Sequence, residues 1–451
     1  MTLIRIYWLL LLLSFAGHAS AMTILKAYTL ALEHAPSYLA ALKEKEAGGE
    51  EENIALAGLL PEIAASYQNS RNRQKQEYVQ QTLSGPNKAI DHNDYASYSG
   101  SVTLTQPLFD YQAITRYRAA QAQKLMADER YRARLQELAI KVTEACLALA
   151  YAQEAVKLAG LKKHAFLEQL SANRRLLQAG EGSITDVTES DARYHLAIAE
   201  EIEVNNELDA ARRELEAIIG APVRNIPLLN GLTSAKFRAL PLKTLDFQTW
   251  QKLALANNPS LRAIRQELEA KRYEVEQYRG GHFPVVQLYA SHTLNDSATD
   301  NTLHQKYRTS SVGVRVKVPF YSGGGISAAT RKATAEYSQR KYQLEENTAT
   351  TLNDLKRVYN GYISSRTRIQ ALSLAMDAAR KQVVATRKSV FAGHRVNLDI
   401  LNAEQQLYSA QLDLINEKYN HIKYWAGLLS KAGLLEINDL AIIDKHFSQA
   451  N

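Results

Sequence analysis

The chain has 451 residues, a mean hydropathy of −0.31 and a formal net charge of +7 at neutral pH. The basic excess is spread along the chain without a dense Lys/Arg tract, so the composition argues against a nucleic-acid-binding protein. Cys146 is the only cysteine, which excludes an intrachain disulfide. Its small apolar neighbours indicate a buried helix residue and not a reactive thiol.

Residues 1–21 have the pattern of a secretory signal peptide. Arg5 precedes an apolar run over residues 6–15, and Ala19-Ser20-Ala21 forms a small-residue cleavage site. The mature chain is expected to begin near Met22. No later segment approaches the roughly 18 consecutive apolar residues of a membrane-spanning helix, so any membrane crossing must use strands.

The rest of the chain contains an internal duplication. Leu30-Ala31-Leu32 and Pro36 recur, in the same order and spacing, as Leu253-Ala254-Leu255 and Pro259. Further matches follow in order, which indicates a duplicated unit with small insertions and deletions. We predict a first repeat over 22–230, a middle belt segment over 221–247, a second repeat over 248–432 and a C-terminal belt or tail over 433–451.

Each repeat is expected to contain short helices, two strands and a long helical hairpin. The strands are indicated by alternating apolar and polar residues, and the hairpins by an apolar period near 3.5 that is typical of coiled coils. Polar segments between the paired strands are interpreted as exposed loops. The predicted ranges are strands at about 61–74, 98–108, 283–294 and 308–319, loops over 69–97 and 295–309, and hairpins over about 112–219 and 325–432.

One strand has a valine on every second residue from Val312 to Val318, with Arg315 and Lys317 on its other face. In a soluble sheet the valines would pack on a core. In a transmembrane barrel they would face lipid, and Arg315 and Lys317 would be charges of a water-filled lumen. Four strands cannot close a barrel and an open edge is not tolerated in lipid, so a membrane-spanning form must be an oligomer; three copies would supply twelve strands.

Two short motifs in the hairpin turns, Gly-Ser-Ile-Thr-Asp-Val at 182–187 and Asn-Leu-Asp-Ile-Leu-Asn-Ala at 397–403, occur in corresponding places of the two repeats. With the duplicated element order, the chain resembles the TolC family of outer-membrane exit ducts of Gram-negative bacteria. The resemblance implies an α+β membrane protein: a homotrimeric twelve-stranded transmembrane β-barrel, continued in the periplasm by a twelve-helix coiled-coil barrel.

The resemblance also implies partners and a cargo route. Family members pass substrates from an inner-membrane transporter, such as an ABC transporter, and a periplasmic adaptor to the outside. This chain is most similar to members that serve type I protein secretion, and small-molecule or multidrug efflux is the alternative within the family. No cofactor, metal or nucleic acid is implied, and outer-membrane lipid is the remaining partner.

In the family, polar links between neighbouring hairpins hold the periplasmic tip closed. Carried over by position, Thr185 and Asp186 are the acceptors of this tip latch and Arg395 is the donor. Helix capping is the alternative role: Ser183 and Asp186 have capping-box spacing, and Asn397 has the residue type of an N-cap.

Asp399 matches the family position that rings the lumen constriction. Three such carboxylates would attract cations, although a charge in the first turn of a helix is the alternative role. Where relatives carry a second acidic residue one turn further on, this chain has Asn402. The constriction is therefore expected to be less acidic than in those relatives.

The motif content indicates no enzyme. The histidines are scattered, and neither a metal-ligand spacing nor a complete phosphate-binding loop is present. The alternative from another class is a periplasmic or surface coiled-coil adaptor or adhesin with a soluble sheet. It accounts for the signal peptide and the heptads but not for four strands with one apolar face each.

Overall fold

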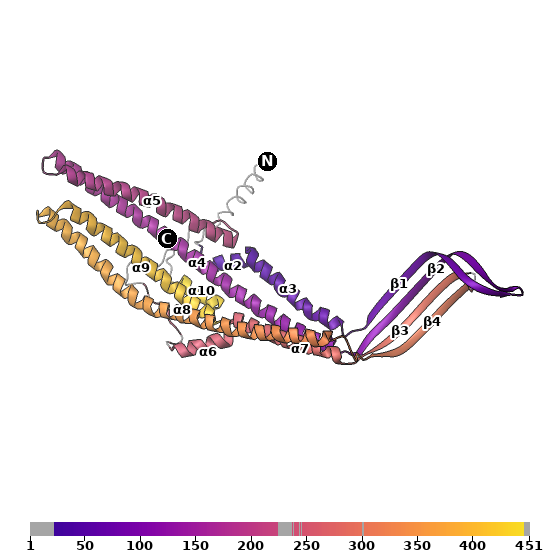
Figure 1. Cartoon of the computed structure of the whole chain (residues 1–451). Coiled ribbons are helices and arrows are strands. Elements are labelled where there is room, and N and C mark those ends of the chain that lie inside the picture. The colour runs from indigo at the N-terminus through magenta and orange to yellow at the C-terminus, as the bar shows by residue number, and fades with distance from the viewer. Residues whose placement is uncertain are drawn as a thin grey trace, which may run out of the picture. The chain divides into compact units, whose positions relative to one another are not determined.

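Figure 1 shows the computed structural model of the chain, which describes residues 22–223, 237, 239–242, 244, 246–299 and 302–445. The predicted signal peptide lies outside the described residues, as do most of the predicted middle belt and the last residues of the predicted tail. The chain divides into two compact units. The first contains the described residues up to Lys43, Glu129–Arg262 and everything from Glu346 onward; the second contains Glu44–Asp128 and Ala263–Glu345.

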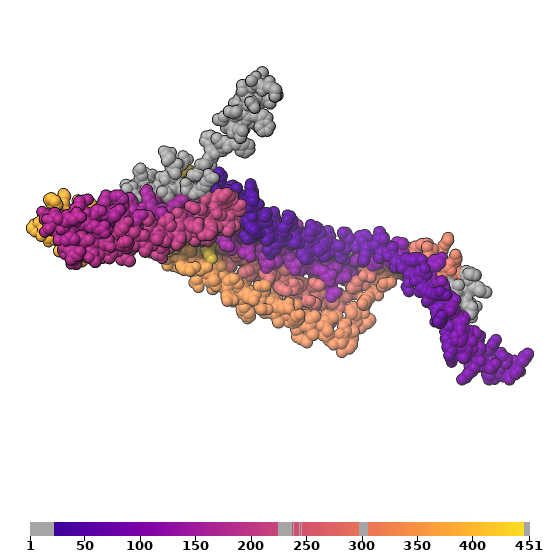
Figure 2. Space-filling view, turned by 90° about the horizontal axis from the view of Figure 1, so that it is seen from above, coloured from indigo at the N-terminus to yellow at the C-terminus, as the bar shows by residue number. Residues whose placement is uncertain are grey.

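The first unit is helical. Helices α4 (Tyr111–Gln178) and α5 (Ile184–Ile219) form one hairpin, and α8 (Gly325–Phe391) and α9 (Asn397–Lys431) form the other. Figure 2 shows the long outer surface that α5 presents in this unit. The shorter helices are α2 (Ile24–His34), α6 (Phe247–Asn257) and α10 (Ile437–Asp444). No helix among the described residues is both long enough and apolar enough to cross a membrane.

The apolar stripes of the long helices meet in one core. Leu138 and Val142 of α4 belong to the same buried cluster as Ile415 and Ile422 of α9, together with residues of α2 and α6. Cys146 is buried in this cluster, and burial raises the pKa of its thiol. The near-3.5 apolar period thus places small and branched side chains along the helix contacts, as in a coiled coil.

The two ends of the described chain meet in this unit. Asp444 of α10 accepts hydrogen bonds from the backbone N–H groups of Ile24 (2.8 Å) and Leu25 (3.1 Å) at the start of α2. These N–H groups have no partner within their own helix. A carboxylate at a helix N-terminus also interacts favourably with the helix dipole, so the C-terminal helix stabilises the first helix of the unit.

The described part of the predicted belt docks on the second hairpin. The backbone of Leu240 is bonded on both sides: its N–H donates to Nε2 of His421 (3.2 Å), and its C=O accepts from the hydroxyl of Tyr362 (2.5 Å). Trp425 donates from its indole N–H to the C=O of Pro241 at 3.0 Å. Side chains of α8 and α9 therefore satisfy buried backbone groups that lack strand or helix partners.

The second unit combines helices with one sheet. Its helices are α7 (Pro259–Arg279), most of α3 (Pro36–Ala57) and the first parts of α4 and α8. The strands are β1 (Glu62–Thr82), β2 (Gly85–Phe109), β3 (Val285–Thr299) and β4 (Thr302–Lys317). They pair in the order β1-β2-β3-β4, and every pairing is antiparallel. The outer edges of β1 and β4 have no neighbouring strand among the described residues.

The strand register aligns the apolar faces. One row across the sheet contains Ile63, Leu104, Ala290 and Val312. Because side chains alternate between faces, the rows two residues away on each strand share this face. The result is one continuous apolar face whose members include Val286, Leu288, Val314 and Val316.

The strands continue beyond the predicted ends, and the prediction that residues 69–97 and 295–309 are loops is wrong. Residues 69–82 pair with 85–98 in a regular ladder, and only Leu83 and Ser84 form the turn. Polar residues on both faces look like a loop in sequence. Backbone hydrogen bonds, however, hold a two-stranded ribbon without an apolar face.

Candidate functional site

The two hairpin turns lie at the same end of the first unit (Figure 1). Each turn has a glycine in the left-handed region that disfavours a Cβ: Gly180 with φ of +77° and Gly393 with φ of +76°. Each is closed by the same type of backbone bond, from Glu181 to Leu176 and from His394 to Ser389, both at 2.9 Å. The duplicated sequence thus forms the same turn twice.

The helices that follow the turns begin differently. Ser183 occupies the N-cap of α5, and its hydroxyl accepts from the N–H of Thr185 at 3.0 Å. At α9 the N-cap position is Val396, which has no acceptor in its side chain. Asn397 is already the first helical residue, so the prediction that it caps α9 is wrong. The carboxylate of Asp399 instead accepts from the N–H of Val396 in a long contact of 3.4 Å.

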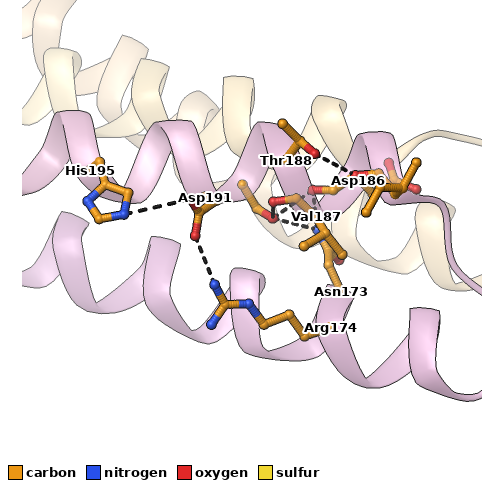
Figure 3. A network of polar contacts seen from close by, with 9 residues as sticks. Asn173, Arg174, Asp186, Val187, Thr188, Asp191 and His195 are labelled. Carbon is orange, nitrogen blue, oxygen red and sulfur yellow. Dashed lines mark hydrogen bonds and ion pairs between the residues drawn. The ribbon is translucent and has the colours of Figure 1, made fainter.

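A buried polar network lies inside the first hairpin. Asn173 of α4 is 1% exposed, and its amide donates to the backbone oxygen of Asp186 and the hydroxyl of Ser190, both at 3.2 Å. Figure 3 shows Asn173 pointing from α4 towards the first turn of α5. Ser190 is fully buried and also donates to the C=O of Asp186 at 2.6 Å. A side chain of α4 thus fixes the start of α5.

A charged pair lies beside this network on the surface of the hairpin. Arg174 of α4 bonds to Asp191 of α5 at 2.9 Å, and His195 lies 3.6 Å from the same carboxylate (Figure 3). These side chains are largely exposed. An exposed pair contributes at most about 1 kcal/mol, so the buried asparagine network is the stronger link.

Polar side chains also join the two hairpins. The amides of Gln169 and Asn173 both bond to Asn397 at the start of α9. Five residues further along α9, the side-chain oxygen of Asn402 accepts a hydrogen bond from Arg193 of α5 at 3.0 Å. The end of the unit is therefore crosslinked by neutral and singly charged hydrogen bonds between α4, α5 and α9.

The predicted latch residues are all at this end, and within one chain they do not pair. Thr185 and Arg395 are exposed, and Asp186 is half-buried. Among the described residues, neither a hydrogen bond nor an ion pair joins Arg395 to Thr185 or Asp186. Asp186 takes part in the network through its backbone oxygen. Its carboxylate lies in the first turn of α5, where a negative charge interacts favourably with the helix dipole, and the Ser183 hydroxyl accepts from Thr185 and not from Asp186.

The predicted constriction residues have partners within the chain. Asp399 lies in the first turn of α9 and is half-buried. Asn402 is exposed and accepts from Arg193. The structure therefore assigns Asn402 a link between hairpins that its residue type alone did not indicate.

The sequence interpretation missed Asn173, Gln169 and Arg193. Asn173 follows Phe166 and Leu170 in steps of four and three, and all three are buried, so it occupies a core position of the coiled-coil stripe. A lone asparagine at such a position is a recognised device that fixes register. That signal was available; its partner Asn397, more than two hundred residues away, was not.

The lumen charges predicted in the sheet lie on the face opposite the valines. Arg315 is in register with Gln287, and its guanidinium lies 5.1 Å from the ring centre of Tyr289. Tyr289 in turn packs over Gly313, where a Cβ would come within 2.8 Å of its hydroxyl. Lys317 follows on the same face. In the part of the chain that the structure describes, no group of acidic, histidine or cysteine side chains could hold a metal ion.

Comparisons with known proteins extend over nearly the whole chain. The family model described as outer membrane efflux protein matches residues 27–221 and 250–434. The alkaline protease secretion protein AprF of Pseudomonas aeruginosa is 42% identical over 95% of this chain and 88% of its own length. The proteases secretion protein PrtF of Dickeya chrysanthemi is 37% identical over 96% and 93%, respectively.

The fold is shared with solved structures at low sequence identity. The crystal structure of CusC matches with a TM-score of 0.78 and 15% identity, over 93% of this chain and 95% of that chain. One long hairpin falls within each of the two matched segments of the family model. The chain therefore belongs to the outer membrane efflux protein family, which includes TolC, and is an outer-membrane transport protein.

Proposed function

We propose that three copies of this chain form an exit duct, in which twelve strands cross the outer membrane and twelve helices line a periplasmic tunnel. The observation that carries the proposal is the exposed apolar face of the sheet. Val312 is 78% exposed and Ile63 is 69% exposed, so no element of the described chain covers this face. A soluble sheet would bury it, whereas lipid would cover it in a barrel.

The open edges of the sheet support an oligomer. β1 and β4 present unpaired backbone groups along their outer sides. In hydrocarbon each such group costs several kcal/mol, so β4 of one copy must pair with β1 of the next. On β3 this face runs from Val286 to Leu294, with His292 as its one polar member, and the span is close to the roughly ten residues that a tilted strand needs to cross a bilayer.

The cargo that the relatives favour is protein. AprF and PrtF are named for protease secretion, and both match this chain along almost its full length. We infer that the chain serves type I secretion of proteases, together with a periplasmic adaptor and an inner-membrane ATP-driven transporter. Efflux of small molecules is the second candidate, because BepC of Brucella suis, which is named an outer membrane efflux protein, is 26% identical over 87% of this chain.

The hairpin ends are proposed as the gate of the tunnel. Arg395 is exposed and has no ion-pair partner among the described residues, so it is free to bond to Thr185 and Asp186 of a neighbouring copy. An arginine bonded to a carboxylate or carbonyl is a strong link that opening can still break. Asp399 would form the constriction ring above it, and Arg315 and Lys317 would line the barrel lumen.

The test of the duct is made in two steps. The purified chain is reconstituted in a planar bilayer, where we expect a small cation-selective conductance, and outer-membrane fractions are examined for a heat-modifiable trimer. A monomeric, non-conducting but folded protein would contradict the proposal.

Protein cargo is then tested by complementation. The chain is expressed in a Pseudomonas strain that lacks AprF, and protease in the medium is measured alongside sensitivity to small toxic compounds.

A further inference from the structure

Four basic residues gather on one face of the sheet, just beyond its apolar rows. Arg71 and Arg73 of β1 follow Ile63 and Tyr67 on the same face, in steps of two. On β4, Arg308 and Lys306 continue the face of Val312, and all four basic side chains are exposed.

The strand register gives the depth of these residues. Arg308 lies in the same row as Leu294, Gly100 and Tyr67. The next row outward contains Lys306, Asp296 and Tyr98. Tyrosine marks the boundary between hydrocarbon and headgroups in membrane barrels, so the basic residues begin where the headgroups begin.

The opposite face is uncharged at the same level. Over these rows it carries Gln68, Ser70 and Asn72 on β1, with Tyr307 and Thr309 on β4. Charges that served only to keep the strands soluble would be found on both faces. Their restriction to the face that continues the valines indicates a ligand on the lipid side.

Two of the four basic residues are paired within the chain. Arg73 bonds to Asp94 at 3.0 Å, and Lys306 bonds to Asp296 at 3.1 Å. No carboxylate among the described residues forms an ion pair with Arg71 or Arg308. These two guanidinium groups are therefore available to an external anion, and their planar forks suit phosphate better than a lysine would.

We propose that Arg71 and Arg308 bind the phosphate groups of outer-leaflet membrane lipid, the phosphorylated glucosamine headgroup of lipopolysaccharide. The proposal rests on the proposed duct, because only in the barrel does this face meet lipid. In the trimer β4 of one copy would lie beside β1 of the next, which brings Arg308 and Arg71 to the same seam. The lipid would then bridge neighbouring copies just above the aromatic boundary.

The experiment measures lipopolysaccharide binding to the purified full-chain trimer in detergent. Wild type is compared with the double variant Arg71→Gln/Arg308→Gln, and with Arg315→Gln/Lys317→Gln as the matched control. The control removes two positive charges from β4, but from the opposite face. We expect about tenfold or more weaker binding for Arg71→Gln/Arg308→Gln, from two lost basic residues at an anionic surface, and less than a twofold change for the control.

Further arms distinguish the source of the phosphate. Phosphatidylethanolamine and inorganic phosphate are titrated against the same trimers, and neither is expected to raise the temperature of trimer dissociation as lipopolysaccharide does. Equal binding by both double variants would overturn the proposal. Inorganic phosphate that stabilises the wild type as well as lipopolysaccharide, and no longer stabilises Arg71→Gln/Arg308→Gln, would overturn the assignment to lipid.

Trimer formation and conductance test the duct separately from the lipid site. Trimer bands and conductance are recorded for every preparation. Normal trimers and channels with no difference in lipid binding would overturn the lipid site alone. Folded wild-type protein that forms neither trimers nor channels would overturn the duct and the lipid site together.

Discussion

The two hairpins of the first unit have the same turn geometry but are held in different ways. The first has a side-chain cap at Ser183 and the buried Asn173 network behind it. The second has Val396 at the cap position, and both tips expose apolar side chains: Phe391 is 96% exposed at the second and Ile184 is 65% exposed at the first. An ion pair between Arg387 and Glu404 joins the two helices of the second hairpin near the tip, and Asn397 and Asn402 link it to the first hairpin.

The two hairpins therefore differ in how firmly their own helices are joined at the end. The end of the first has a buried network between its own helices α4 and α5, in addition to its bonds to α9. The end of the second has the ion pair of Arg387 and Glu404 but, among the described residues, no buried amide network between its own helices, and it is linked to the first hairpin and, in the proposed trimer, to the neighbouring copy. A gate needs one element that stays and one that moves, and the second hairpin lacks the buried amide network that holds the first.

Away from the tips the contrast is reversed. Buried residues are frequent along α9, and they include Glu417, Lys418 and His421; those of α5 are sparse and uncharged. Burial raises the pKa of Glu417, which lies 3.1 Å from Arg368. Burial lowers the pKa of Lys418 to about 8, partly offset by Glu154. The second hairpin is therefore anchored along its middle by groups that are costly to bury.

The largest effect is expected from titration of Lys418, which is 1% exposed. Its pKa of about 8 lies below the ordinary 10.5, so between these values the unfolded chain holds a proton that the folded chain has lost. The free energy of unfolding should therefore rise with pH over this window, by about 3 kcal/mol in all. Denaturant unfolding of the purified protein at a series of pH values measures this slope.

The comparison with variants isolates the contribution of Lys418, because other groups also titrate at alkaline pH. Lys418→Met should remove the rise, while Lys423→Met, a partly exposed lysine on the same helix, should retain it. Equal pH slopes for the wild type and Lys418→Met would show that the buried charge does not set stability.

The next largest effect is expected from Asn173→Ala, which removes the network of the first hairpin. The change leaves the hydroxyl of Ser190 with fewer partners and breaks the link to Asn397. Loss of buried hydrogen bonds should cost about 2 kcal/mol. Unfolding measurements check this value, with Asn205→Ala on the exposed surface of α5 as control. A cost no greater than that of the control would mean that the first hairpin is not held from within.

Arg395→Ala tests whether the second hairpin depends on the neighbouring copy. A charge-assisted hydrogen bond contributes about 1.5 kcal/mol or more, so its loss should shift the closed–open equilibrium roughly tenfold towards open. Single-channel conductance should rise. Lys388→Ala removes the same charge from an exposed position of α8 and should have no such effect. Unchanged conductance in a folded Arg395→Ala trimer would exclude the latch.

Asp399→Ala removes the carboxylate from the first turn of α9. If three Asp399 carboxylates form a ring, divalent cations on the periplasmic side should block the wild-type channel, and block by the variant should be about tenfold weaker, or 1.4 kcal/mol. Asp413→Ala on the exposed face of the same helix is the control. Equal cation block of the Asp399→Ala and Asp413→Ala channels would contradict the ring. Asp399 would then have only its structural contact with the N–H of Val396.

Much of the architecture could be predicted because it depends on local patterns. The alternation from Val312 to Val318 and the steps of three and four along α9 each reflect one repeating backbone geometry. The ribbon over residues 69–98 was missed because its stability comes from backbone pairing, which leaves no trace in side-chain polarity. The docking of Leu240 on Tyr362 and His421 was missed because it joins residues more than one hundred positions apart.

The smallest effect is expected from exchanging the caps of the two hairpins. Ser183→Ala removes the hydroxyl that accepts from Thr185 and should cost about 1 kcal/mol. Val396→Ser supplies a side-chain acceptor where α9 has none and should stabilise by a similar amount or less, since the N–H of Asp399 already donates to the C=O of Val396 at 3.1 Å. If the second hairpin is the moving element, the two changes should also differ in function. Val396→Ser should lower the open probability, whereas Ser183→Ala, in a hairpin that Asn173 holds independently, should change stability but not conductance. The opposite pattern would make the first hairpin the moving part.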